Sequence, residues 1–273
     1  MNDGDSVTAV LIAAIAVAGL FGLLIGSFLN VVIWRVPRDE SVVRPGSACP
    51  GCGAPIRPRH NLPVLSWLLL RGRARCCGMP IRARYPMVEL ATGGAFAAVA
   101  AWALVGPLSG WALPAFWYFA AISIALAVID LDVHRLPDKI VLPSYPVVAA
   151  LLLLPVVLDR DGSALIRVAV GGVALWLFYF LLVVIYPAGM GGGDVKLAGL
   201  LGMYLGWLGY RELVVGAAAG FALGGVLSVL LLATGVVTRK TLVPYGPFML
   251  VGAWLAVAVA DPVSDWYLRA AGL

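Results

Sequence analysis

Two aspartates stand where an apolar segment meets a polar one, and together they could carry out acid–base chemistry. Asp130 closes the apolar run AISIALAVID, and Asp194 lies in GMGGGDVK, directly before another apolar run. An acidic group at the centre of a membrane helix costs at least ~2.5–3.5 kcal/mol, less near the ends, so such residues usually serve a function. This pair is therefore the first candidate for a reactive site.

Two carboxylates held close together can share one proton, because like charges a few ångströms apart resist joint ionisation. The ionised member can take a proton from water while the protonated member polarises a carbonyl group. An aspartyl peptidase divides the labour in this way and forms no covalent intermediate. Asp132 and Asp138 lie in the same loop as Asp130, DLDVHRLPDK, and spacing alone excludes neither as the true partner of Asp194.

The residues around these acids suggest how a substrate is held. Gly191, Gly192 and Gly193 directly precede Asp194. Glycine adopts backbone conformations closed to other residues, so we expect these three to admit a substrate strand. Asp194 should also begin a helix, where the dipole favours its anionic form. Glu89 lies just inside another apolar run, and we expect it either at the rim of the active site, contacting substrate, or paired with Arg84 or another base.

The composition is that of a membrane protein. Of the 273 residues 62% are hydrophobic and 12% are charged, against roughly 45–50% and about 25% in soluble domains. Apolar runs of about 17–25 residues, long enough to cross a bilayer, recur along the chain. We therefore expect an all-α integral membrane bundle of about eight transmembrane helices, at Val7–Trp34, Met87–Val105, Trp111–Ile129, Ile140–Leu158, Ala164–Ile185, Val195–Tyr210, Leu213–Gly235 and Leu242–Ala260.

The distribution of basic residues predicts the orientation. With eight spans, 15 of the 19 Lys and Arg residues fall on one side of the membrane and 4 on the other. The rich side is cytoplasmic by the positive-inside rule, which puts both termini outside and both aspartates at the cytoplasmic face. The net charge of +5 then reflects orientation and contact with the lipid bilayer, so we expect no nucleic-acid partner.

One segment interrupts the membrane pattern. It runs from Arg35 to Arg84, is rich in Arg, Pro and Gly, and holds all four cysteines. We expect a small cytoplasmic insertion, which divides the chain into a first span at 1–34, an insertion at 35–86 and a transmembrane core at 87–273. Within it NLPVLSWLLL, residues 61–70, is apolar but too short to span, and should lie at the interface or on the bundle.

Six blocks of this sequence resemble one family, the bacterial prepilin peptidases (type IV leader peptidases), a branch of the GxGD membrane aspartyl proteases. The resemblance covers nearly the whole chain in the family's order. It rests on GSFLNVVIWRVPR at 26–38, HNLPVLSWLLLRGR at 60–73, RYPMVEL at 84–90, IDLDVHRLPDKIVLP at 129–143, GMGGGDVKLAGLLG at 189–202 and PYGPFML at 244–250.

The resemblance implies a function that composition and spacing do not supply. It implies that Asp130 and Asp194 are the catalytic pair. It also implies a substrate: the basic leader of type IV prepilin-like or pseudopilin precursors, cut at the cytoplasmic face of the bacterial inner membrane just after a glycine. Many members also N-methylate the new amino terminus with S-adenosylmethionine. Cleavage itself should need no cofactor, and the oligomeric state is not indicated.

The cysteines form an internal repeat that is typical of a structural zinc site. CPGCGAPI at 49–56 is followed by ARCCGMPI at 74–81. Two CxxC knuckles supply four thiolates to tetrahedral zinc, and a cytoplasmic location disfavours disulfides. The second knuckle departs from the family pattern, since Ala74 stands opposite Cys49 and Cys76 adjoins Cys77, the counterpart of Cys52. Either Cys76 reaches the metal from a distorted turn, or His60 completes the shell, or no metal binds.

We therefore predict a membrane aspartyl endopeptidase, and two other classes compete with that reading. An ion-coupled transporter could use Asp130 and Asp194 as a proton relay, but transport sites favour the bilayer midplane and inverted repeats. These acids lie at span ends, and the two halves show no such symmetry. A scaffold of the pilus-assembly machinery, with vestigial acids, is the other alternative, and a cleavage assay separates all three.

Overall fold

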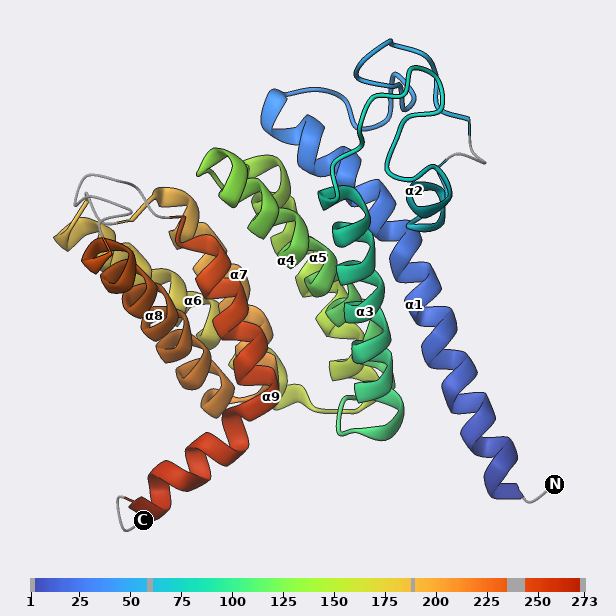
Figure 1. Ribbon diagram of the computed structural model, residues 1–273. Helices are drawn as coiled ribbons and strands as arrows, with labels where there is room; N and C mark the ends of the chain where they lie inside the picture. The colour runs from blue at the N-terminus through green and yellow to red at the C-terminus, as the bar shows by residue number, and fades with distance from the viewer. Residues whose placement is uncertain (1–2, 58–60, 188–189, 235–243, 271–273) are drawn as a thin grey trace. The chain divides into compact units, whose positions relative to one another are not determined.

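The structure is a computed structural model that describes residues 3–57, 61–187, 190–234 and 244–270. Eight long helices dominate it, and the described residues contain no β-strand beyond two isolated bridges (Figure 1). The long helices are α1 (Asp3–Arg35), α3 (Arg84–Val105), α4 (Leu113–Val133), α5 (Asp138–Leu158), α6 (Gly162–Ile185), α7 (Gly192–Leu208), α8 (Tyr210–Ala233) and α9 (Gly246–Ala270). The all-helical membrane fold expected from the sequence is confirmed.

Each of the eight predicted spans corresponds to one of these helices. Seven are long and apolar enough to cross a membrane by length and composition. The exception is α7, whose 17 residues reach only the lower limit of about 17 for a span. Two predicted spans had wrong bounds in a way that matters for the site. Helix α4 continues to Val133, which places Asp130 within a helix, and α9 begins at Gly246 and runs to Ala270.

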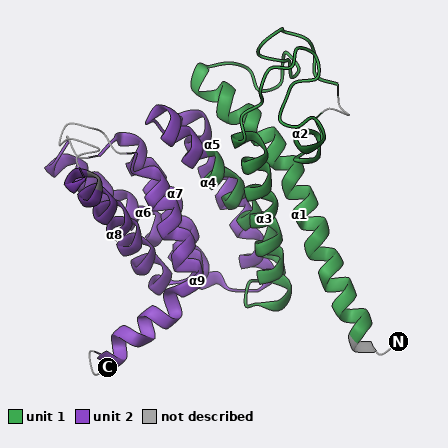
Figure 2. Cartoon of the chain, viewed as in Figure 1, with its two compact units in different colours: residues 1–125 green, residues 126–273 purple. Residues whose placement is uncertain are grey.

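The chain divides into two compact units, Met1–Ala125 and Leu126–Leu273 (Figure 2). The boundary falls inside α4, so Asp130 belongs to the second unit together with Asp194. The three-part division predicted from the sequence, at 1–34, 35–86 and 87–273, stays a prediction. The two compact units divide the chain at another position and do not test it.

In the first unit α1 and α3 lie side by side and approach closely at small residues (Figure 1). A Cβ atom at Gly22 would lie 2.8 Å from the carbonyl oxygen of Thr92, and one at Gly26 would lie 2.7 Å from the Cα atom of Glu89. Membrane helices associate through such backbone approach. The insertion that follows α1 contains the turn η1 (Val36–Arg38) and the short helix α2 (Leu65–Leu69).

In the second unit α7 is the central helix and packs against α5, α6, α8 and α9. Its contact with α6 has no room for side chains at Gly171, Gly202 and Gly206, where any Cβ atom would overlap the backbone of the facing helix. The phenol of Tyr145 on α5 donates a 2.6 Å hydrogen bond to the carbonyl of Lys196 on α7. The bond from Tyr145 holds the first turns of α7, where Asp194 lies.

Candidate active site

Asp130 lies in the last turns of α4 and is 4% exposed. Its Oδ2 atom accepts a 3.1 Å hydrogen bond from the backbone N–H of Gly246, the first residue of α9. A Cβ atom at position 246 would lie 2.8 Å from this oxygen, so the approach depends on glycine. The positive end of the α9 dipole therefore faces Asp130 and favours a negative charge there.

Asp194 lies in the first turn of α7 and is 8% exposed. The backbone N–H of Gly191, the N-cap residue, donates a 3.1 Å hydrogen bond to its Oδ2 atom. In return the backbone N–H of Asp194 donates to the carbonyl of Gly191 at 3.1 Å. The predicted position of Asp194 at a helix N-terminus is confirmed. The two acids are bound in the same way, because each accepts a hydrogen bond through Oδ2 from a backbone N–H at the start of a helix.

The two carboxylates are close enough to repel one another electrostatically. Leu136, in the loop between α4 and α5, helps to bring them together and is 9% exposed. A Cβ atom at Gly193 would lie 3.1 Å from the Cβ atom of Leu136, and one at Gly246 would lie 3.3 Å from its Cδ2 atom. Leu136 thus packs against the starts of both α7 and α9. Leu136 could not be found from the sequence, because an apolar side chain in a loop gives no chemical signal.

The two rival acids lie apart from this buried pair. Asp132 is exposed, because residues two positions apart on a helix point to different sides. Asp138 begins α5, is exposed, and forms an ion pair of 2.8 Å with Lys196. His134 is exposed at the end of α4 in a left-handed conformation (φ 53°), within electrostatic range of Asp130.

Of the three glycines directly before Asp194, Gly193 is the one whose place leaves little room for a side chain, and none has an unusual backbone conformation. Gly191 has an ordinary extended conformation (φ −85°, ψ 155°), and the left-handed glycines among the described residues are Gly53, Gly72 and Gly78. The expectation of unusual backbone angles at Gly191, Gly192 and Gly193 was therefore wrong. Instead, Gly193 packs against Leu136, and Gly192 is exposed, with open space where a side chain would be.

Glu89 belongs to the first unit, where it connects α3 to the insertion. It is 8% exposed, and its Oε2 atom accepts a 2.7 Å hydrogen bond from the backbone N–H of Val64. The Ser27 hydroxyl also hydrogen-bonds to it. Val64 has φ 59°, which is costly for a β-branched residue, and the bond to Glu89 holds that turn. The partners found for Glu89 are thus Val64 and Ser27.

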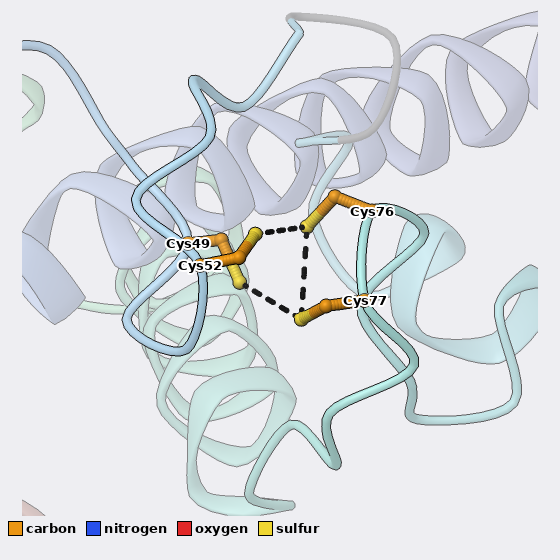
Figure 3. Close-up of side chains that lie close together, drawn as sticks. All are labelled: Cys49, Cys52, Cys76 and Cys77. Atoms are coloured by element: carbon orange, nitrogen blue, oxygen red, sulfur yellow. Dashed lines mark hydrogen bonds between the residues drawn. The ribbon is translucent and has the colours of Figure 1, made fainter.

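The four cysteines lie together in a geometry that fits a tetrahedral metal (Figure 3). All four Sγ atoms are within 4.8 Å of one another. The Sγ–Sγ distances are 3.3 Å for Cys52–Cys76, 3.6 Å for Cys49–Cys77 and 3.9 Å for Cys76–Cys77. Thiolates at about 2.3 Å from a tetrahedral zinc ion lie about 3.8 Å apart, so the donor set fits zinc.

The repeat in the sequence is also a repeat in the structure. The backbone N–H of Cys49 donates to the carbonyl of Ala54, and that of Ala74 donates to the carbonyl of Met79. Cys76, inside the second turn, still brings its sulfur into the cluster. Of the alternatives left open by the sequence, the arrangement fits the one in which Cys76 reaches the cluster from the second turn. His60, the alternative ligand, lies outside the described residues.

The local environment shifts the pKa values of two of the thiols in opposite directions. Backbone N–H groups of Cys52 and Gly51 lower the pKa of the Cys49 thiol to about 6. Hydrogen bonds with the side chains of Cys52 and Cys49 raise the pKa of Cys76 to about 12.

Comparison with known proteins gives matches over nearly the whole chain. Residues 20–103 match the bacterial peptidase A24 N-terminal domain, and residues 117–238 match the type IV leader peptidase family. Among similar proteins, the prepilin leader peptidase/N-methyltransferase of Aeromonas hydrophila is 35% identical, covering 91% of this chain and 92% of the relative. Those of Pseudomonas aeruginosa and Stutzerimonas stutzeri are 32% and 34% identical, covering 93% and 96% of both chains respectively. No solved structure matches.

Proposed function

The chain belongs to the type IV leader peptidase family, and from this premise we propose that Asp130 and Asp194 are the catalytic pair of a membrane aspartyl endopeptidase. Its substrates are the leaders of type IV prepilin-like or pseudopilin precursors. The observation that supports the proposal is that two buried carboxylates lie within electrostatic range of one another, and each accepts a hydrogen bond through Oδ2 from a helix-start N–H.

The proposed chemistry follows from this arrangement. Like charges at close range favour one shared proton between the two acids. The ionised carboxylate takes a proton from water as the water oxygen bonds to the scissile carbonyl carbon. The protonated carboxyl donates a hydrogen bond to the carbonyl oxygen. Collapse of the tetrahedral intermediate breaks the C–N bond, and the leaving amine takes up a proton from the pair.

The substrate contacts are also proposals. Gly191 and Gly192 are exposed at the start of α7, so an extended leader could pass close to their backbone, whereas Gly193 serves through its packing on Leu136. We also propose that Glu89, a buried acid near the membrane boundary, contacts the basic leader. Its bond to Val64 would then couple leader binding to the insertion.

A transporter and a non-catalytic scaffold are not favoured. Asp130 and Asp194 lie at helix ends, whereas transporter sites favour the midplane of the bilayer. The relatives are named as peptidases. For orientation, we propose a multi-pass protein of the bacterial inner membrane with both termini outside and the catalytic pair facing the cytoplasm, supported by the basic loops on that side.

Two further groups are proposed as ligands. Cys49, Cys52, Cys76 and Cys77 would hold one structural zinc ion, which would stabilise the insertion and take no part in cleavage. The names of the relatives include N-methyltransferase, so we propose that the protein can also use S-adenosylmethionine to methylate the new amino terminus. No residue of this chain is assigned to that step.

Reconstitution tests the function directly. The purified protein in lipid vesicles should cut candidate precursors from the same genome, and mass spectrometry of the product should find the new amino terminus just after the leader. A methylated terminus should be found only when S-adenosylmethionine is added. Intact precursor after incubation with wild-type protein would argue against the peptidase in favour of a scaffold or transporter.

A further inference from the structure

Tyr245, the residue directly before α9, has a buried hydroxyl that the chemistry above does not use. Its Oη atom is shielded from solvent, and no group in the described part of the chain forms a hydrogen bond of standard geometry with it, although the Tyr179 hydroxyl lies close enough to interact. Folded proteins leave few buried polar atoms unpaired, because each forfeits the hydrogen bonds it made to water. An unpaired buried donor at a functional site suggests a partner that arrives with the substrate.

The phenol ring is held firmly in place. Its centroid lies 5.8 Å from that of Phe221 on α8 and 6.2 Å from that of Tyr179 on α6. A Cβ atom at Gly224 on α8 would lie 2.5 Å from Cε2 of Tyr245, so the ring packs directly on the α8 backbone. Two aromatic contacts and the α8 backbone leave little freedom for the ring to turn. The packing of the ring therefore fixes the direction of the hydroxyl.

The segment that holds Tyr245 interacts with both proposed catalytic acids. The next residue along the chain, Gly246, donates its N–H to Asp130. The phenol itself lies within electrostatic range of Asp194. The carbonyl of Tyr245 accepts hydrogen bonds from Phe248 and Met249, which fix this residue at the start of α9. One short segment thus supports Asp130 through its backbone and presents a hydroxyl near Asp194.

We propose that Tyr245 is a further catalytic residue, whose Oη donates a hydrogen bond to the scissile carbonyl oxygen as negative charge builds on it. The proposal rests on the peptidase function proposed for Asp130 and Asp194. A preorganised donor in a water-poor site stabilises developing charge without reorganising during the reaction. Tyr245 keeps its proton throughout, since it gives only a hydrogen bond, and the protons exchanged in the reaction remain with the two acids and the leaving amine.

The test is Tyr245→Phe, which keeps the ring and removes only the unpaired hydroxyl. We expect kcat for precursor cleavage to fall about 10²-fold, the typical effect of losing one oxyanion donor. KM, the shape of the kcat–pH profile and the thermal unfolding midpoint in detergent should stay close to those of the wild type. Rates are compared on monodisperse protein, so that a loss of folded material is not read as a loss of catalysis.

The matched control is Tyr145→Phe, which removes a structural hydroxyl bonded to the carbonyl of Lys196. It should lower the unfolding midpoint more than Tyr245→Phe and lower kcat less. Wild-type kcat in Tyr245→Phe would overturn the proposal. A loss accompanied by a shifted pH profile would also overturn it, because Tyr245 would then act on the acids. Asp194→Asn, assayed in parallel, separates the two proposals: full cleavage by that variant would reject the acid pair itself.

Discussion

The backbone N–H of Gly246 lies 3.1 Å from Oδ2 of Asp130, across a separation of 116 residues in the chain. This hydrogen bond brings the start of α9 to the end of α4 and aims a helix dipole at the buried acid. Asp194 receives the equivalent bond from Gly191, only three residues away. One acid is therefore positioned by its own segment, and the other by a distant segment.

The first prediction concerns the acids as a pair. Asp130→Asn and Asp194→Asn should each lower precursor cleavage by about 10²–10⁴-fold, because either change removes the shared proton. Both proteins should still insert and remain monodisperse. Asp132→Asn and Asp138→Asn, which alter exposed acids, should retain more activity. A gel-shift cleavage assay in detergent measures all four, and loss with Asp132→Asn but not Asp130→Asn would move the active acid to position 132.

The second prediction tests the bond between α9 and Asp130. Gly246→Ala adds a Cβ atom that would lie 2.8 Å from Oδ2, so the carboxylate or the helix must move. Displacing a reacting group by about 1 Å can cost about 10²-fold in rate, and we expect a fall in kcat of that order. Gly225→Ala on α8 is the control, because no atom lies within 4 Å of its added Cβ. Equal activity of the two variants would show that the Gly246 contact does not matter to catalysis.

The third prediction concerns the cysteine cluster. Protein purified under reducing conditions without chelator should carry about one zinc ion per chain, measured by elemental analysis. Cys52→Ser and Cys76→Ser should each release it and loosen the insertion, while cleavage should fall less than in Asp194→Asn. Ala74→Cys should bind zinc no less tightly than the wild type, because it places a thiol opposite Cys49 in the repeat. Metal-free protein from this preparation would leave the four cysteines as a remnant of a site.

The fourth prediction concerns orientation. Tags at both termini should be accessible only from outside the cell, and the cysteines at 49–77 should be reachable only from the cytoplasm once zinc is chelated. The basic loops favour this arrangement. Protease protection of the tags and selective alkylation in inverted vesicles provide the two measurements. A cytoplasmic amino terminus would contradict the proposed orientation and would place the acids on the wrong face for a basic leader.

The sequence by itself determined the membrane fold, the family and the two candidate acids. These are local properties. Apolar runs of spanning length predict transmembrane helices directly. An acid at the end of such a run can be recognised without knowing its neighbours in space. The repeat at 49–56 and 74–81 is likewise visible in the sequence alone. Asp194 was placed at a helix start because the glycines and the apolar run adjoin it in the chain.

Only the tertiary structure decided which groups surround the acids. The bond from Gly246 to Asp130, the packing of Leu136 on two helix starts and the unpaired hydroxyl of Tyr245 depend on segments far apart in sequence. Such contacts cannot be predicted from hydropathy and spacing, because they depend on how closely small residues let the helix backbones approach. For the same reason the sequence left the place of Cys76 open, whereas the fold of the second knuckle brings its sulfur to within 3.3 Å of that of Cys52.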